Sequence, residues 1–296
     1  MTLPDFLVIG AMKSGTTTVY HDLLTQPGVF APLDKEPETL CTDEVLTPTG
    51  LAAYEKLFKP SKPGDLCFEA STAYAKLPDF AGMAERAARL RDEHTKPTKA
   101  VYIVRDPIKR LISHHHHEYS ERAMPADVNE AVESFPRLAN YSKYAMQVEP
   151  WINALGRENV HIILFERYIA DRAAGLAALC TFLGLTPDLS TLDTARASNT
   201  SEGKPVHNPF SRFVANNPLY RVLIRHKLPD SWRTGLRALI SSTAPPRPPG
   251  PSPDTIARVR TEIEDDMRRF AEILDEPHPI WPAPHSPPGS GSTSST

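Results

Sequence analysis

Residues 10–18, GAMKSGTTT, place two glycines, a lysine and a row of hydroxyl side chains directly after a short apolar run. Glycines let the backbone approach a ligand closely, and the N–H groups at the start of a following helix attract negative charge. Lys13 would neutralise that charge, and Ser14, Thr16 and Thr17 add hydrogen-bond donors. The stretch therefore predicts a site for a phosphate or sulfate group.

The position of the lysine separates this loop from the common nucleotide-binding pattern GxxxxGK[ST]. Here Thr16, and not lysine, follows Gly15, while Lys13 comes two residues before it. The usual pattern holds the β- and γ-phosphates with its lysine and a magnesium ion with the next hydroxyl. A different phosphate-bearing ligand is expected, although a tight turn with an incidental lysine is the plainer structural alternative.

A second group of candidate ligand-binding residues lies in VYIVRDPIKRLISHHHHE, residues 101–118. Arg105 ends an apolar run, and Ser113 lies eight residues further on, beyond a turn. Ligands of open α/β sheets collect at the carboxyl ends of the strands, so we expect both side chains near Lys13. The guanidinium of Arg105 is suited to a phosphate monoester.

The elements that must position these residues follow an alternating pattern. Apolar runs predict buried strands and longer amphipathic patterns predict helices, as in a parallel sheet covered on both faces. The expected strands are 6–9, 66–68, 100–104 and 160–165. The expected helices are 16–24, 80–92, 107–120, 142–154 and 171–183, with a last one that follows the cap Ser252. This order predicts one P-loop-like, three-layer α/β fold with a central, mostly parallel sheet flanked by helices.

Composition narrows the class of protein. The 296 residues are 40% hydrophobic and 23% charged, with a net charge of -3, which gives no global reason to expect nucleic acid as a partner. Cys41, Cys67 and Cys180 are few and widely spaced, as is typical of reduced thiols in the cytoplasm. The sequence contains no CxxC pair, so metal binding is not expected. The apolar run 6–9 is far shorter than the ~20 residues of a membrane-spanning helix.

Domain limits follow from the proline-rich and basic segments. We expect a single domain over residues 1–285 and a disordered tail over 286–296. Between Lys204 and Arg247, eight Lys or Arg residues stand against one acidic residue. Region 204–253 is therefore expected to be a basic, Pro-rich insertion or cover, packed over the sheet, facing the acceptor, or touching a membrane surface if the acceptor is lipid-linked.

KSGTT after one strand and R-D-P-x-x-R-x-x-S after a later one resemble two motifs of sulfotransferases that use 3'-phosphoadenosine 5'-phosphosulfate (PAPS). The resemblance is closest to bacterial relatives of the heparan sulfate sulfotransferases and covers roughly residues 5–200. It implies PAPS as the donor, without a metal ion. It assigns the 5'-phosphosulfate to Lys13, Ser14, Gly15, Thr16 and Thr17, and the 3'-phosphate to Arg105 and Ser113; Lys204 would reach the donor from a polar loop.

The same resemblance suggests a general base. PLDKEPETL, residues 32–40, is similar to the family's K-E-P element, whose glutamate takes the acceptor proton. Glu36 then has this role, and Glu38 is a solvated neighbour. His117 is the second choice, because some cytosolic sulfotransferases use a histidine. The run 114–117 points around a whole helix, so its four histidines cannot serve one metal ion.

FEASTAYAK, residues 68–76, resembles the family's E-x-[ST]-x-x-Y element. Glu69, Ser71 and Tyr74 are therefore expected at the sheet edge near donor and acceptor. The heparan enzymes carry lysine directly after this glutamate, whereas this chain has Ala70. The missing cation argues against a polyanionic glycan as the acceptor, unless Lys76 takes its place.

These patterns predict a cytoplasmic, PAPS-dependent sulfotransferase that acts on a hydroxyl group of a small molecule or a carbohydrate. One alternative is a nucleotide kinase or another phosphoryl transferase with an aberrant P-loop. Another is a nucleotide-binding module without catalysis. The sequence specifies neither the acceptor nor the oligomeric state.

Overall fold

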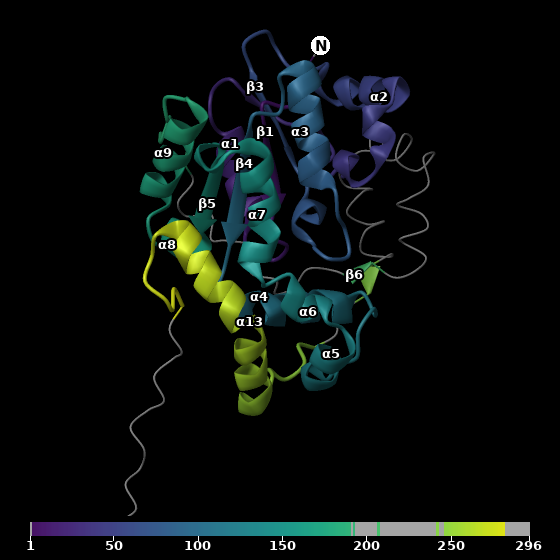
Figure 1. Cartoon of the computed structure of the whole chain (residues 1–296), viewed down its shortest axis with the longest axis vertical. Helices are drawn as coiled ribbons and strands as arrows, with labels where there is room; N and C mark the ends of the chain where they lie inside the picture. The colour runs from purple at the N-terminus through teal and green to yellow at the C-terminus, as the bar shows by residue number, and fades with distance from the viewer. Residues whose placement is uncertain (1, 191, 193–205, 208–240, 243–245, 282–296) are drawn as a thin grey trace, which may run out of the picture.

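The central sheet has five parallel strands in the order β2-β3-β1-β4-β5. The computed structural model describes residues 2–190, 192, 206–207, 241–242 and 246–281 (Figure 1). The strands are β1 Phe6–Gly10, β2 Val29–Phe30, β3 Leu66–Ala70, β4 Lys99–Val104 and β5 Val160–Leu164. The four expected strands are confirmed. Strand β2 was not expected, because two residues carry no readable period.

The helices follow the expected alternation with additions in the connections. They are α1 Thr16–Leu24, α2 Pro48–Phe58, α3 Met83–His94, α4 Pro107–Ser120, α5 Val128–Ser134, α6 Arg137–Asn140, α7 Tyr144–Leu155, α8 Phe165–Ala170, α9 Arg172–Leu183 and α13 Pro253–Leu274. Short 3-10 helices span η1 Thr39–Cys41, η2 Asp43–Leu46, η3 Thr72–Ala75 and η4 Arg157–Asn159. A two-residue antiparallel pair joins β6 Val206–His207 to β7 Ser241–Ser242.

Helix ends are fixed by the caps that the sequence contains. The side chains of Asp106, Asp171 and Ser252 each accept a hydrogen bond from a backbone N–H in the first turn of α4, α9 and α13. Gly184 ends α9 in the left-handed conformation, with φ of 82°. Such caps satisfy backbone groups that the helix itself leaves unpaired, which explains why these boundaries were predicted closely.

Alternation along the strands builds two hydrophobic layers. In β1, Leu7 and Ile9 face a core shared with α2, α3, α7 and α13, whereas Phe6 and Val8 face a core shared with α1, α8 and α9. The three-layer arrangement is therefore confirmed (Figure 1). A third cluster joins α4, α5, α6 and α13, and Figure 1 shows these helices gathered at one end of the sheet.

Part of the expected domain organisation falls on residues that the structure does not describe. Lys204, most of region 204–253 and the tail 286–296 lie outside the described residues. The described end of the basic region, residues 246–252, leads into α13. Among the described helices, none combines the length and the apolar character needed to cross a bilayer.

Candidate active site

The carboxyl ends of the strands meet at one edge of the sheet, where a cavity of about 750 Å³ opens. The loop after each strand contributes to its wall: Lys13 follows β1, Glu36 follows β2, Thr72 follows β3, Arg105 follows β4 and Phe165 follows β5. Sequence-distant residues are thus brought together as the parallel sheet requires.

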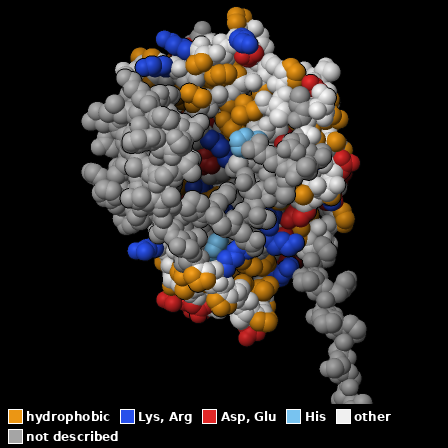
Figure 2. Space-filling model, turned by 180° about the vertical axis from the view of Figure 1, so that it is seen from behind, with side chains coloured by type: hydrophobic (Ala, Val, Ile, Leu, Met, Phe, Trp, Pro, Cys, Tyr) orange, Lys and Arg blue, Asp and Glu red, His pale blue; other side chains and the backbone are white. Residues whose placement is uncertain are grey.

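The cavity wall is strongly cationic. Its described residues include six Lys or Arg side chains and one carboxylate, that of Glu36. Figure 2 shows Lys, Arg and His side chains gathered around a hollow in the face opposite the view of Figure 1. The cations are Lys13, Lys35, Lys76, Arg105, Lys109 and Arg247. This imbalance favours a ligand with several negative charges.

The loop after β1 forms an anion cradle at the start of α1. Lys13, Gly15, Thr16 and Thr17 all line the cavity, and the first turn of α1 contains no acidic residue. Gly15 has φ of 88°, and a Cβ atom there would lie 2.1 Å from the ring of Phe165. Only glycine fits this position, because both the backbone conformation and the close ring exclude a side chain.

Ser14 departs from the expected arrangement. Its side chain is fully buried, it is absent from the cavity wall, and its Oγ has no hydrogen-bond partner among the described residues. Its N–H donates to the carbonyl of Ala11 at 3.1 Å and closes the turn of the loop. This geometry supports a structural role for Ser14 and gives no support for a side-chain contact with the donor.

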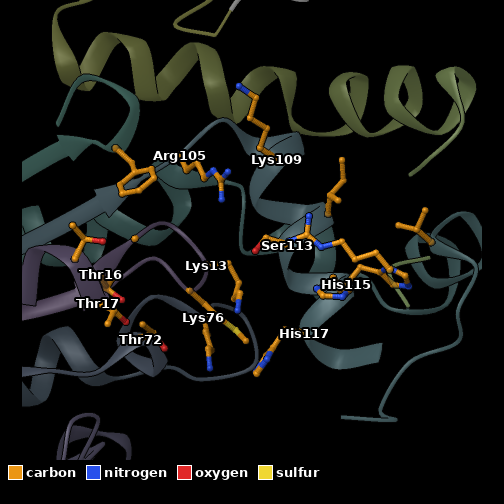
Figure 3. A pocket seen from close by; sticks show the side chains of 18 of the residues that line it. Lys13, Thr16, Thr17, Thr72, Lys76, Arg105, Lys109, Ser113, His115 and His117 are labelled. Carbon is orange, nitrogen blue, oxygen red and sulfur yellow. The ribbon is translucent and has the colours of Figure 1, made fainter. Parts of the chain in front are cut away.

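A second cationic group lies on the opposite side of the cavity, after β4. Arg105 is followed by α4, whose Lys109 and Ser113 also line the cavity. Ser113 lies on the side of Lys13, whereas the Lys109 side chain points away from it (Figure 3). The guanidinium carbon of Arg105 lies 5.8 Å from the ring centroid of Phe165. Phe165 thus contacts both groups, since its ring also packs against Gly15. The Phe165 ring therefore connects the two expected anion sites.

Glu36, in the loop after β2, is held by three contacts. Its backbone has φ of 65°, and its N–H donates to the carbonyl of Ala70 at 3.0 Å. The Thr72 hydroxyl donates to Oε2 at 2.9 Å, and Lys35 Nζ lies 3.5 Å from Oε1. Lys35 Nζ also donates to Thr17 Oγ1 at 3.0 Å. The carboxylate is therefore oriented next to the donor loop.

His117 lines the cavity from the last turns of α4, and Figure 3 places it beside Lys13 and Lys76. Burial lowers the pKa of His117, and the positive charge of Lys13 lowers it further. A neutral imidazole can accept a proton. The structure therefore brings together the first and second candidates for the base, Glu36 and His117, at one cavity.

Another member of the histidine run, His114, is structural. It is fully buried and stacks on Tyr141 with ring centroids 5.5 Å apart. His115 is also buried, with Nε2 2.9 Å from the carbonyl of Pro125, but it lines the cavity as well. Arg110, the second arginine of the 3'-phosphate pattern, is fully buried too and donates to Ser142 Oγ and to the carbonyl of Leu138. Its role is to fix α4 against α6.

Glu69 lies at the sheet edge, as expected, but its carboxylate does not reach the cavity. Glu69 is 1% exposed, is absent from the cavity wall, and accepts hydrogen bonds from Tyr54, Ser71 and Tyr74. The Ser71 and Tyr74 hydroxyls in turn accept from the backbone N–H groups of Glu38 and Leu40. The element therefore supports the 36–40 loop from below.

Several cavity residues were not identified from the sequence. Phe165 was expected inside a strand but begins α8. Thr72 and Lys109 lie within the motifs 68–76 and 101–118, but other residues of those motifs were chosen as candidates. Arg247, from the Pro-rich segment, also lines the cavity, and its charge contributes to the lowered pKa of His116 after burial. The spacing of Lys109 and Ser113, four residues apart on one helix face, was a usable signal.

The hydrogen-bond donors and cations of the cavity wall suit a ligand with two separate anionic groups. Ammonium, hydroxyl and helix N-terminal donors surround the loop after β1, and a guanidinium, an ammonium and a hydroxyl stand after β4. Within the described ranges, no group of three or more His, Cys, Asp or Glu side chains is placed to bind a metal ion. These residues fit the 5'-phosphosulfate and the 3'-phosphate of PAPS.

Comparisons with known proteins agree with this geometry. Residues 3–236 match the family model described as the sulfotransferase domain. Heparan sulfate glucosamine 3-O-sulfotransferase 3B1 of Mus musculus is 27% identical over 199 residues, which cover 62% of this chain and 46% of that protein. Bifunctional heparan sulfate N-deacetylase/N-sulfotransferase 4 of Mus musculus is 28% identical over 205 residues, 62% of this chain and 23% of that protein. The chain spans less than half the length of these relatives.

Solved structures share the fold. A sulfotransferase from Alicyclobacillus acidocaldarius superposes with a TM-score of 0.55 and 23% identity, covering 79% of this chain and all of the other. Mouse sulfotransferase SULT7A1, solved in complex with PAP, gives a TM-score of 0.52 and 16% identity over 92% of this chain and 86% of the other. The P-loop-like, three-layer fold is therefore the one that sulfotransferases use.

Proposed function

Because the chain belongs to the sulfotransferase domain family, we propose that it transfers the sulfuryl group of PAPS to a hydroxyl group of an acceptor. One observation carries this proposal. Two cationic, hydroxyl-bearing groups, after β1 and after β4, face a single cavity that holds one carboxylate among its described lining residues. A donor with phosphates at both ends of its ribose needs two such groups.

Within this proposal the donor is held by residues from both sides of the cavity. Lys13, Gly15, Thr16 and Thr17 would bind the 5'-phosphosulfate, and their common position on the wall supports this. Arg105 and Ser113 would bind the 3'-phosphate, with Lys109 as a further cation. The assignment of Lys204 to the donor stays a prediction.

In the proposed reaction, the protein stabilises the leaving group and removes the proton of the acceptor. The donor supplies a sulfuryl group whose bond to the bridging oxygen breaks while a bond to the acceptor oxygen forms. Lys13 would stabilise the negative charge that develops on the bridging oxygen, and Glu36 would take the acceptor proton. The hydrogen bond from Thr72 and the charge of Lys35 orient the carboxylate for that task.

We place the acceptor among hydroxyl-bearing small molecules or carbohydrates. The relatives named above include sulfotransferases of heparan sulfate, but Ala70 lacks the cation that those enzymes would offer a sulfated sugar. Lys76, which lines the cavity beside His117, supports some negative charge on the acceptor. A cytoplasmic location is part of the proposal, and the three cysteines, all free, support it.

A test uses ligand-dependent thermal unfolding of the full chain. Adenosine 3',5'-bisphosphate (PAP), at a hundredfold excess over its dissociation constant, should add about 2.7 kcal/mol to the free energy of unfolding and raise the midpoint by several degrees. In Arg105→Ala, at least ten times more bisphosphate should be needed to produce the same shift of the midpoint. Arg89→Ala, which removes an exposed arginine that pairs with Glu93 on α3, is the matched control and should keep the shift.

The same measurement separates the kinase, and a turnover assay with PAPS separates the binding module. A kinase would be stabilised by ATP with magnesium and not by the bisphosphate, and that result would contradict the sulfotransferase proposal. A binding module without catalysis would respond to the bisphosphate yet form no sulfated product from PAPS with any hydroxyl acceptor tested.

A further inference from the structure

The peptide group between Arg105 and Asp106 is held by side chains on both of its polar atoms. The Tyr144 hydroxyl donates to the carbonyl of Arg105 at 2.5 Å. The N–H of Asp106 donates to Glu166 Oε1 at 3.0 Å. A peptide group fixed in this way cannot rotate without breaking both hydrogen bonds.

Trp281, seven residues beyond the end of α13, contacts both of the side chains that hold this peptide. Its indole N–H donates to Glu166 Oε2 at 3.1 Å. Its ring lies 5.9 Å from that of Tyr144 and stacks on Phe270, with centroids 6.5 Å apart and an interplanar angle of 5°. One residue of the C-terminal segment therefore closes the clamp, which we define as Tyr144, Glu166 and Trp281.

The clamp has consequences on both sides of the peptide. On one side, the Arg105 guanidinium enters the cavity over the ring of Phe165. On the other, the Asp106 carboxylate caps α4 by accepting from the N–H of Lys109 at 2.9 Å. Since α4 carries Ser113, the orientation of one peptide group fixes the guanidinium and the hydroxyl together.

The charge states of the clamp suit this role. Tyr144 is fully buried, and burial raises the pKa of its hydroxyl, so the group stays protonated and donates. Each Glu166 oxygen accepts from a different N–H group. Neither Glu166 nor Trp281 lies on the cavity wall, so their contribution to ligand binding must act through Arg105 and α4.

We propose that Trp281 is a positioning residue for the 3'-phosphate site, acting through Glu166 and Tyr144 on the peptide that carries Arg105. The segment after α13 then sets how strongly the protein distinguishes a nucleotide with a 3'-phosphate from one without it. This inference rests on the proposed function, because it takes Arg105 as the ligand of that phosphate.

Titration calorimetry of the full chain tests it with two nucleotides, adenosine 3',5'-bisphosphate and adenosine 5'-monophosphate. In Trp281→Phe, which keeps an aromatic ring but lacks the N–H, the dissociation constant of the bisphosphate should rise about tenfold, the equivalent of roughly 1.4 kcal/mol. Tyr144→Phe should have a similar effect. The monophosphate, which does not use Arg105, should bind all three proteins within about twofold.

Trp151→Phe is the matched control. Like Trp281, Trp151 donates its indole N–H, at 3.2 Å to the carbonyl of Tyr74, but it is fully buried and lies outside the clamp. Trp151→Phe should leave unchanged the ratio of the monophosphate dissociation constant to the bisphosphate dissociation constant. If this ratio falls equally in Trp281→Phe, Tyr144→Phe and Trp151→Phe, or in none of them, the positioning role is overturned while the proposed function stands. A wild-type protein that binds both nucleotides equally overturns the proposed function itself.

Discussion

At the scale of single residues, the two principal catalytic candidates share an unusual backbone. Lys13 and Glu36 have φ of 68° and 65°, a conformation that side-chain-bearing residues seldom adopt. Such strain persists only where surrounding contacts hold it, and it is concentrated at functional sites. Here the holding contacts are visible: Glu36 is tied to the carbonyl of Ala70 and to the hydroxyl of Thr72.

Glu36→Gln tests the general base. The amide keeps the shape of the side chain but cannot take a proton, so kcat for sulfuryl transfer should fall roughly 10²- to 10⁴-fold. The dissociation constant of adenosine 3',5'-bisphosphate should stay within about twofold, because the product nucleotide does not need the base. Initial rates with PAPS and an acceptor found by screening, together with calorimetry, measure both quantities.

Glu38→Gln is the control for the same loop. Its side chain is exposed, and its backbone N–H, which donates to Ser71 Oγ, is untouched by the change. Normal turnover is expected. If Glu36→Gln also retains turnover while His117→Gln abolishes it, the base is the histidine on α4.

At the scale of elements, α4 shows how one helix separates its duties by face. Lys109, Ser113 and His117 recur every four residues and line the cavity. Arg110 and His114, one residue after the first two, lie in the fully buried face against α6. A consecutive run of histidines therefore divides between ligand site and core because each residue turns by about 100°.

The buried face of α4 predicts a pH dependence of stability. Burial lowers the pKa of His114 to about 4, against an ordinary value of 6.5, although Glu118 beside it acts in the opposite direction. The unfolded chain binds the proton more readily, so stability is full above pH 6.5 and is lost as the pH falls toward 4. Between pH 7 and 5 the loss from this group should be roughly 2 kcal/mol.

His114→Gln should remove that part of the slope when the free energy of unfolding is measured by urea denaturation across this window. Glu118 cannot account for the difference, because its pKa is lowered to about 2, primarily by His114, whose Nε2 lies 3.4 Å from Oε1, and it stays ionised above pH 5. His161, whose pKa burial also lowers to about 4, contributes equally to both proteins. Parallel pH profiles for the wild type and the variant would show that His114 is not the titrating group.

At the scale of the whole molecule, the sequence allowed the skeleton to be predicted more completely than the site. The bounds of α4 and α9 follow from local caps such as Asp106 and Asp171, and parallel topology follows from alternation. These signals alone place Lys13 and Arg105 at one edge. The two-residue β2 has no comparable local signal. Helices α2 and α5 do begin at side-chain caps, Thr47 and Asp127, but these signals were not used to predict them.

Burial of polar groups was the part that sequence could not supply. Glu69 and Ser14 belong to patterns that suggest ligand contact, yet both are buried away from the cavity. Whether a polar residue faces a site or a core depends on partners far along the chain, as the hydroxyls of Tyr54 and Tyr74 illustrate for Glu69. The place of Phe165 at the cavity was not predicted either, because its ring packs against Gly15, which lies far away in the sequence.

A buried ion pair between Asp22 and Arg172 joins α1, which follows the loop after β1, to α9. Asp22 on α1 is 2% exposed and accepts from Tyr168 at 2.7 Å and from Arg172 Nε at 3.0 Å. Asp22→Asn removes the charge from this pair inside the α1, α8 and α9 layer, and breaking a buried pair costs on the order of 3 kcal/mol. The thermal midpoint should fall by several degrees.

The affinity for adenosine 3',5'-bisphosphate, measured well below that midpoint, should nevertheless be preserved in Asp22→Asn. The start of α1 is fixed independently, because Ala11 N–H donates to the carbonyl of Ile103 on β4 and Ser14 N–H closes the loop on Ala11. Glu133→Gln, at an exposed pair with Arg258, is the control for removing a surface charge and should change the midpoint little, since such pairs contribute about 0 to 1 kcal/mol. Weaker bisphosphate binding in Asp22→Asn alone would mean that the anion cradle depends on the packing of the whole layer and not only on its own loop.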